Sequence, residues 1–380
     1  MQSDDPSIND SGVGARPEVS VVIPTRSRPD LVLRAVRSVL RQTMTNFEVV
    51  VVIDGPDPET EAVLDALGDP RVRSVPLPES TGAPTARNIG VREARAPWTA
   101  LLDDDDEWLP TKLATQLKAA AAAQAGLPIV AARLVNHTPR AQFVLPRRLP
   151  DRGEPLSEYL TVRRGLFHGD GFIQTSTIMA PTELLRHVPF AAGLRRLQEL
   201  DWTLRATSED DVELVITPEP LVVWYTDENR PRVSFDLPWE AQLDWLRSSR
   251  SLFTPRAYAA ITMSVISSMA APTHSPAIFR MLLQEARRHG RPRARDYLAF
   301  LQIWLIPPRI RHMVRDRILG RRDAVRSGSG WPPRFAAGSD VAHGLAGTTE
   351  VGSPAVPNDT NASASTPDRA SAQPTDDVRR

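Results

Sequence analysis

The segment Phe47–Ile53 limits the possible folds of this chain more than any other, because it is an almost unbroken apolar run. Such a run is typical of a strand that is buried on both faces of a parallel sheet. A second β-branched run, Val19–Ile23, comes before it and stops at Pro24. Between the two, Asp30–Gln42 has apolar residues at helical spacing. Strand, helix and strand in this order predict an α/β fold with a parallel sheet and right-handed crossovers.

The alternation continues along the chain. We expect helices at 59–67, 85–95, 110–125 and 198–206. We expect strands at 72–75, 98–102, 129–135, 172–179 and 214–225. From Leu237 to Leu319 the pattern is helical and is interrupted by prolines. We therefore predict a Rossmann-like domain over 18–236 and a helical region over 237–320, with 1–17 and 321–380 too polar to fold.

Composition excludes several classes of protein. The chain has 46 Lys and Arg against 46 Asp and Glu, so it lacks the overall positive charge that nucleic-acid binding usually requires. It has no cysteine, which excludes disulfides and thiolate metal sites and is compatible with the cytosol. We expect no signal peptide, because no cationic segment followed by an apolar stretch stands at the start of the sequence, and we find no apolar run long enough to span a membrane.

The acidic run Asp103–Asp106 directly follows the strand expected at 98–102. It therefore lies at the carboxyl edge of the sheet, where open α/β sheets bind ligands. Four adjacent carboxylates repel one another unless a cation neutralises them, and Mg²⁺ and Mn²⁺ prefer such oxygen ligands. The alternative is a solvated turn that caps the helix beginning near Pro110. The buried strand before the run and Trp108 after it favour a metal site.

Two further features belong to the same edge. Asp54 ends the strand Phe47–Ile53, although Asp followed by Gly is also an ordinary turn pair. Gly82 permits a tight turn, and Arg87 with Asn88 is placed near a helix start, where phosphates bind. Alone, Arg87 is equally compatible with an ion pair to a surface carboxylate.

Taken in order, these segments resemble the family 2 glycosyltransferases of the GT-A fold. The resemblance covers about residues 18–230 and is carried by Val19–Thr25, Ser38–Thr43, Phe47–Gly55, Gly82–Gly90 and Leu101–Leu113. It implies an inverting enzyme that transfers a sugar from a nucleotide-sugar, by default a UDP-sugar, to an acceptor hydroxyl. The acceptor would be a glycan or a lipid-linked sugar, and the product a glycan, cell-envelope polysaccharide or glycolipid. The implied cofactor is Mn²⁺ or Mg²⁺.

The resemblance also assigns roles to matching positions. The positions expected to bind the donor nucleotide are Pro24, Thr25, Arg28, Asp54, Arg87, Asp103 and Asp104, with Asp54 at the base. The DxD-type metal motif falls on Asp103–Asp105, and Asp105 is the expected direct ligand together with Asp103. On the acceptor side, the positions implied are Gln174, Thr175 and Ser176, which as strand residues are also compatible with a structural role.

Inverting transfer requires a general base that accepts the proton of the acceptor hydroxyl. In the family this base is an acid that opens a short helix, six residues before an arginine. Counting back from Arg205 gives Glu199, where the family more often has Asp. Asp201 is the alternative base, and a solvated helix face that carries both acids is the non-catalytic reading.

The segment 297–317 combines an apolar cluster, Tyr297–Ile306, with a following arginine-rich stretch. This pattern is typical of a membrane interface, so the segment is a candidate for peripheral contact with the inner face of the membrane. Packing of the helix on the catalytic domain is the alternative.

Two other functions compete with glycosyl transfer. A sugar-nucleotidyltransferase also uses an α/β sheet and metal-bound carboxylates, but Ile23–Arg26 lacks the glycines of its phosphate loop. A non-catalytic sugar-nucleotide-binding protein is disfavoured by the intact run Asp103–Asp106, whereas Glu199 in place of Asp is compatible with it.

Overall fold

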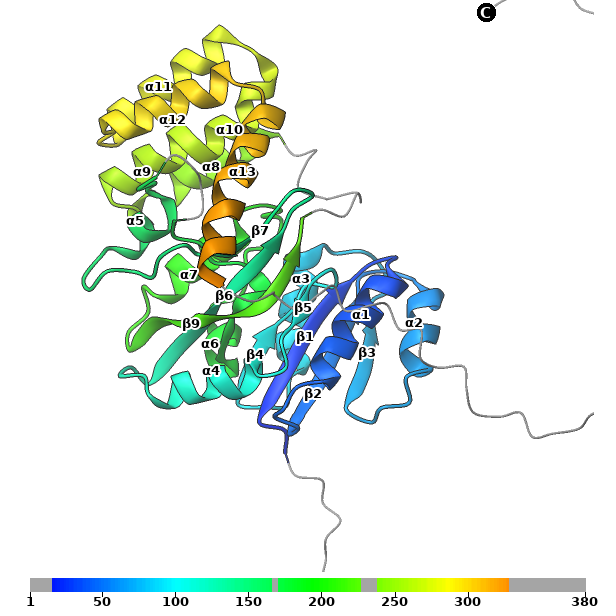
Figure 1. Ribbon diagram of the computed structural model, residues 1–380. Helices are drawn as coiled ribbons and strands as arrows, with labels where there is room; N and C mark the ends of the chain where they lie inside the picture. The colour runs from blue at the N-terminus through cyan, green and yellow to red at the C-terminus, as the bar shows by residue number, and fades with distance from the viewer. Residues whose placement is uncertain (1–15, 166–169, 227–237, 328–380) are drawn as a thin grey trace, which may run out of the picture. The chain divides into compact units, whose positions relative to one another are not determined.

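The computed structural model describes residues 16–165, 170–226 and 238–327, without the side chains of 319–327. Four parallel strands form the first half of its sheet, in the order β3 (Val72–Pro76), β2 (Phe47–Ile53), β1 (Val19–Thr25) and β4 (Trp98–Leu101) (Figure 1). Every residue of β1 and β2 is buried, as their apolar runs predict.

The predicted end of β1 before Pro24 is wrong, because the strand continues to Thr25. Pro24 pairs with Val52 in the parallel register, and the carbonyl of Thr25 still accepts a hydrogen bond from the amide of Asp54 at 2.9 Å. A proline at the end of a strand removes only its own N–H, so the pairing survives it.

The second half of the sheet is mixed. Its path runs from β4 through β8 (Met179–Pro181), β6 (Leu127–His137) and β9 (Val212–Tyr225) to β5 (Glu107–Trp108), with β7 (Gln142–Leu145) beside β6. Strands β6 and β9 are parallel, while β8, β5 and β7 pair antiparallel with their neighbours. The short strands β5 and β7 have no clear signal in the sequence.

The strand predicted at 172–179 is wrong. The segment contains a 3₁₀ helix, η1 (Thr175–Thr177), and only its last residue enters β8. The side chain of Gln174 accepts from the amide of Ser176 at 2.9 Å, and the hydroxyl of Thr177 donates to the carbonyl of Gln174 at 2.6 Å. Side chains that bond to nearby backbone groups in this way compete with strand pairing.

Helices cover both faces of the parallel half, because successive strand residues point to opposite sides. One face packs against α1 (Pro29–Leu40), α2 (Pro58–Asp65) and α4 (Lys112–Ala121). The other packs against α3 (Ala83–Glu93), α6 (Thr182–His187) and α7 (Gln198–Ala206). The helix predicted at 110–125 is thus shorter at both ends, whereas α7 has the predicted bounds.

Glycine at position 90 brings α3 close to the sheet. A Cβ atom there would lie 2.3 Å from Cγ1 of Val22 and 3.1 Å from Cγ2 of Val52. The first distance is shorter than side-chain packing tolerates, so only glycine allows this approach. The close packing fixes the position of Arg87, which lies on the same helix.

The C-terminal region is helical, as predicted. It comprises α8 (Trp239–Ser248), η2 (Arg250–Leu252), α9 (Pro255–Ile261), the π-helical turn η3 (Thr262–Ile266), α10 (Ser267–Ala270), η4 (Ala271–Thr273), α11 (Pro276–His289), α12 (Ala294–Leu305) and α13 (Pro308–Ser327). Prolines open α9, α11 and α13, where their missing N–H costs nothing. Helices α8 to α12 share a hydrophobic core with α7 and with α5 (Leu156–Thr161).

The structure tests only one of the two predicted boundaries of the helical region. Helix α13 extends beyond the predicted end of the helical region at 320. The boundary at 236 stays a prediction, and most of the two ends predicted to be disordered lies outside the described residues. Among the helices that the structure describes, none is both long and apolar enough to cross a membrane.

Candidate active site

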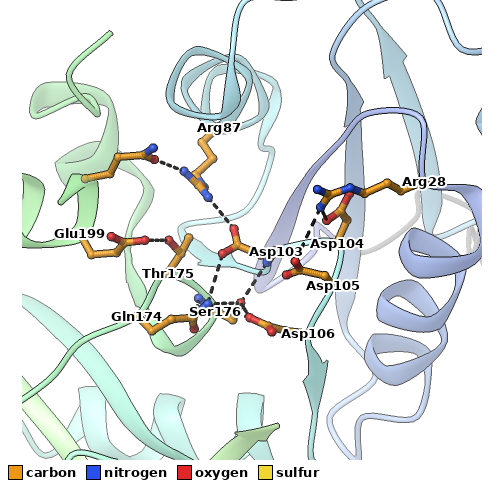
Figure 2. Close-up of polar contacts among 11 residues, drawn as sticks. Arg28, Arg87, Asp103, Asp104, Asp105, Asp106, Gln174, Thr175, Ser176 and Glu199 are labelled. Atoms are coloured by element: carbon orange, nitrogen blue, oxygen red, sulfur yellow. Dashed lines mark hydrogen bonds and ion pairs between the residues drawn. The ribbon is translucent and has the colours of Figure 1, made fainter. Parts of the chain in front are cut away.

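The acidic run forms a tight turn directly after β4, in which the amide of Asp106 donates to the carbonyl of Asp103 at 3.2 Å. A turn of this kind brings its first and fourth residues together. As a result Asp103, Asp105 and Asp106 each offer a carboxylate oxygen, and these three oxygens lie within 4.8 Å of one another (Figure 2). We call these three residues the carboxylate cluster.

Asp104 points away from the carboxylate cluster. It accepts hydrogen bonds from the hydroxyl of Thr25 at 2.8 Å and from the guanidinium of Arg28 at 3.1 Å. Thr25 ends β1 next to Pro24, and Arg28 immediately precedes α1. Three positions predicted to bind the nucleotide are therefore in direct contact, at the carboxyl end of the central strand.

Asp106 is fully buried, and its role was not predicted individually. Its Oδ2 accepts from Nε2 of Gln174 at 2.7 Å and from Oγ of Ser176 at 2.6 Å, while among the described residues its Oδ1 has no hydrogen-bond partner. Burial, and then the charges of Asp105 and Asp103, raise its pKa well above the ordinary value. A buried oxygen without a partner, beside two further carboxylates, fits a divalent cation.

Asp104 provides a test of these electrostatics in the metal-free protein. Burial, and then repulsion by Asp105, raise its pKa from 3.8 to about 6. Between these two pH values the folded protein keeps a proton that the unfolded chain has released. This tighter proton binding by Asp104 stabilises the folded state. Its contribution is complete below pH 3.8 and is lost as the pH rises through about 6. It corresponds to about 3 kcal/mol.

We predict that the Asp104→Asn variant becomes more stable relative to wild type as the pH rises across this window. Urea unfolding of both proteins in EDTA, in steps from pH 3.8 to above pH 6, measures the difference. A difference that stays constant over this range would contradict the raised pKa of Asp104.

Arg87 connects the carboxylate cluster to α7. Its guanidinium is buried and donates to Oδ1 of Asp103 at 2.5 Å (Figure 2). It also donates to Oε1 of Gln198 at 2.5 Å. Burial disfavours its charge, but the carboxylates of Asp103 and then Glu199 outweigh this effect and raise its pKa. Arg87 is thus part of the site rather than a surface ion pair. Gln198 was not predicted.

Asn88 follows Arg87 in α3 but binds the backbone of Phe190 instead of the carboxylate cluster. Its side chain donates to the carbonyl of Phe190 at 2.8 Å and accepts from the amide of the same residue at 2.9 Å. Both ends of the amide group are therefore occupied by one backbone position. Asn88 anchors the segment between α6 and α7 rather than contributing to the carboxylate cluster.

The two candidate bases on α7 have different environments. Glu199 is half-buried and accepts a hydrogen bond from the hydroxyl of Thr175, on the side of the carboxylate cluster (Figure 2). Asp201 is buried, and it accepts from Arg205 at 2.7 Å and from the indole of Trp245 at 2.9 Å. Asp201 therefore ties α7 to α8, and Glu199 is the acid that lies at the site.

The segment 174–176 holds the carboxylates in place. Gln174 donates to both Asp103 and Asp106, and Ser176 accepts from the amide of Asp103 at 3.0 Å. All three residues of the segment are buried. Their contact with the acceptor stays a prediction, while in the structure their polar groups bind the site's own acids.

The carboxylate of Asp54 is hydrogen-bonded to the turn formed by residues 80–82. Its two oxygens accept four hydrogen bonds from Ser80, Thr81 and Gly82, at 2.6–3.0 Å. Burial opposes its charge, but these bonds outweigh that effect and lower its pKa. Gly82 has a φ of 86°, which only glycine adopts readily. Asp54 therefore shapes the turn next to the nucleotide edge, and its contact with the base stays a prediction.

Fold and site together define a class of protein: an α/β protein with a candidate cation site at the carboxyl edge of its sheet and a further acid, Glu199, on the neighbouring helix α7. Residues 20–179, which carry the carboxylate cluster, match the family described as glycosyl transferase family 2. The predicted resemblance to this family is thus confirmed for residues 20–179, and the predicted α/β fold with its helical extension is confirmed as well.

Individual relatives are similar over shorter stretches. The succinoglycan biosynthesis protein ExoO of Rhizobium meliloti is 36% identical over 122 residues, which are 32% of this chain and 35% of that protein. The UDP-Glc:alpha-D-GlcNAc-diphosphoundecaprenol beta-1,3-glucosyltransferase WfaP of Escherichia coli is 30% identical over 99 residues, 26% of this chain and 39% of that protein. The match thus spans less than two-fifths of either relative.

A solved structure of S. aureus TarS 1-349 in complex with UDP-GlcNAc aligns with a TM-score of 0.44 at 14% sequence identity. The alignment covers 83% of this chain and 93% of that one.

Proposed function

We propose that this protein is an inverting glycosyltransferase that moves a sugar from a nucleotide-diphosphate sugar, a UDP-sugar, to an acceptor hydroxyl. One observation carries the proposal. The carboxylate cluster and Glu199 are linked within one site, because Gln174 donates to Asp103 and Asp106 while the adjacent Thr175 donates to Glu199. A site that binds a diphosphate through a cation and also holds a half-buried acid has both groups that the reaction requires.

Asp103, Asp105 and Asp106 would hold Mn²⁺ or Mg²⁺, and the partnerless Oδ1 of Asp106 supports this assignment. When bound, the ion would neutralise the charge that develops on the departing nucleoside diphosphate. Arg87 and Gln174 keep Asp103 in position through its two oxygens. Thr25 and Arg28, which bind Asp104 beside the cluster, would contact the nucleotide.

Glu199 would act as the general base. The acceptor oxygen forms a bond to the anomeric carbon from the side opposite the leaving diphosphate, which inverts the configuration, and its proton passes to Glu199. Thr175 orients the carboxylate by donating its hydroxyl hydrogen. Asp201 is unsuited to this role because Arg205 and Trp245 already occupy both of its oxygens.

We further propose that the acceptor is a glycan or a lipid-linked sugar in cell-envelope polysaccharide synthesis. Support comes from the relatives, one named for succinoglycan biosynthesis and another for transfer from UDP-Glc to a diphosphoundecaprenol-linked sugar. We place the reaction in the cytoplasm, at the inner face of the membrane. The chain contains no cysteine, which is compatible with a reducing compartment.

A thermal-shift screen of nucleotide-sugars tests the proposed donor. A ligand at about 100 times its Kd stabilises the folded protein by about 2.7 kcal/mol, which is several degrees in Tm. We expect this rise with a UDP-sugar in Mn²⁺ and little rise with the same sugar in EDTA or with dTDP- and GDP-sugars. Release of pyrophosphate from UTP and a sugar 1-phosphate would instead support a nucleotidyltransferase.

A further inference from the structure

The exposed apolar side chains of the protein are concentrated in one part of its sequence. Among the side chains that the structure describes, the large apolar residues that are exposed and lie on α12, on α13 or between them are Leu298, Leu301, Leu305, Ile306, Ile310, Met313, Val314 and Ile318. Elsewhere in the described part, Leu149 is the only further example. Scattered exposed leucines are ordinary, but such a cluster marks an interaction surface.

Each helix has a second face that already packs on the protein. On α12, Phe300 and Ile303 are buried in the helical core, and the ring of Phe300 lies 4.7 Å from that of Phe279. On α13, the buried Asp316 pairs with Arg140 at 3.8 Å, and the guanidinium of Arg315 lies 5.5 Å from the ring centre of Phe143. The helices therefore dock on the domain through these faces.

The exposed residues follow helical spacing on the remaining faces. On α12, Leu298, Leu301 and Leu305 recur at intervals of three and four residues, and they are 63%, 43% and 75% exposed. On α13, Ile310, Val314 and Ile318 recur at intervals of four residues. Packing within the described part of the chain leaves these apolar stripes exposed.

The same part of the chain carries a strong positive charge. Residues 287–326 contain twelve arginines and three aspartates, with no lysine or glutamate, although the whole chain has equal numbers of basic and acidic residues. Of the three acids, Asp296 pairs with Arg256, and Asp316 pairs with Arg315. Arg309 and Arg317 are exposed next to the apolar stripes.

We propose that α12 and α13 form a surface that docks on an anionic lipid bilayer. The apolar stripes enter the boundary between head groups and acyl chains, and the arginines contact lipid phosphates. A second copy of the chain fits less well, because it would bring two strongly positive segments together. The inference goes beyond the proposed function, since it uses no residue of the active site and holds for any donor.

Flotation of the full chain with lipid vesicles tests the proposal. We expect binding to vesicles of phosphatidylcholine mixed with phosphatidylglycerol, weaker binding to phosphatidylcholine alone, and a decrease with added salt. The double variants Leu298→Gln/Leu305→Gln and Arg309→Gln/Arg317→Gln should each lower the partition coefficient about tenfold or more, since each arginine contributes roughly a fivefold effect.

Matched controls exist elsewhere on the surface. Leu149→Gln removes an exposed leucine, and Arg37→Gln/Arg92→Gln removes two exposed arginines; both should bind vesicles as wild type does. Urea unfolding checks that each variant is folded, and Glu199→Gln should also bind normally, which separates this proposal from the catalytic one.

Three results would overturn the inference. One is the absence of binding to anionic vesicles, and another is equal binding by the leucine double variant. The third is a dimer of the wild-type chain in solution that Leu298→Gln/Leu305→Gln dissociates, which would assign the surface to a second copy.

Discussion

Replacement of Glu199 by Gln should lower the rate of sugar transfer by about 10²–10⁴-fold and leave the affinity for the donor nearly unchanged. The amide keeps the size of the side chain and can still accept the hydrogen bond from Thr175, but it cannot take up a proton. Transfer rates give kcat, and titration with UDP in Mn²⁺ gives the donor affinity. Full activity in the variant would exclude Glu199 as the base.

Asp201→Asn is the matched control on the same helix. It breaks the ion pair with Arg205, which is only 30% exposed, so we expect a loss of about 1–3 kcal/mol in the free energy of unfolding. The folded fraction should retain its kcat, because Asp201 does not face the site. If Asp201→Asn abolished transfer while Glu199→Gln did not, the two roles would be reversed.

Replacement of Asp105 by Asn should weaken Mn²⁺ binding by more than the roughly 10–100-fold typical of losing an outer-shell partner of a metal ligand. The substitution removes one of the three carboxylates of the cluster and with it a full negative charge. Nucleotide binding that depends on the metal should fall in parallel. Calorimetric titration with Mn²⁺, followed by UDP in the presence and absence of Mn²⁺, measures both effects.

Asp104→Asn provides the control within the same acidic run. Asp104 binds Thr25 and Arg28 instead of joining the carboxylate cluster, so its replacement should change Mn²⁺ affinity much less than that of Asp105. Asp106→Asn should resemble Asp105→Asn. An equal loss in all of these variants would mean that the run binds the ion as a diffuse patch of charge, without the geometry that the turn creates.

The sequence predicted the parallel half of the sheet closely, because a short continuous apolar run can be buried in few ways other than as a central strand. Phe47–Ile53 has to be buried on both faces, and the strand β2 has these bounds. The alternation with amphipathic helices then orders the first strands and directs their carboxyl ends, with Asp54 and Asp103, to one edge. Local pattern was sufficient there because strand burial and helix spacing both leave a periodic signal.

The polar segments were less predictable, since hydrogen-bond partners far along the chain decide their structure. The segment 172–179 looks like a strand, yet its side chains bind their own backbone and the acids of the cluster. The bounds of α7 were predicted correctly, but not which of its acids lies at the site. Glu199 and Asp201 are about 200° apart around the helix, so they face different surroundings. Packing against α8 turns Asp201 away from the site, because Trp245 of α8 binds it.

The sequence by itself determined that this is an α/β protein whose residues 20–179 match glycosyl transferase family 2, with a run of four acids at the end of a buried strand. Only the tertiary structure separated those acids. A turn, hydrogen bonds from Gln174 and Ser176, and the contacts of Asp104 with β1 and α1 bring Asp103, Asp105 and Asp106 together. Four identical neighbours differ only in the direction of their side chains, and contacts with residues distant in the sequence set that direction.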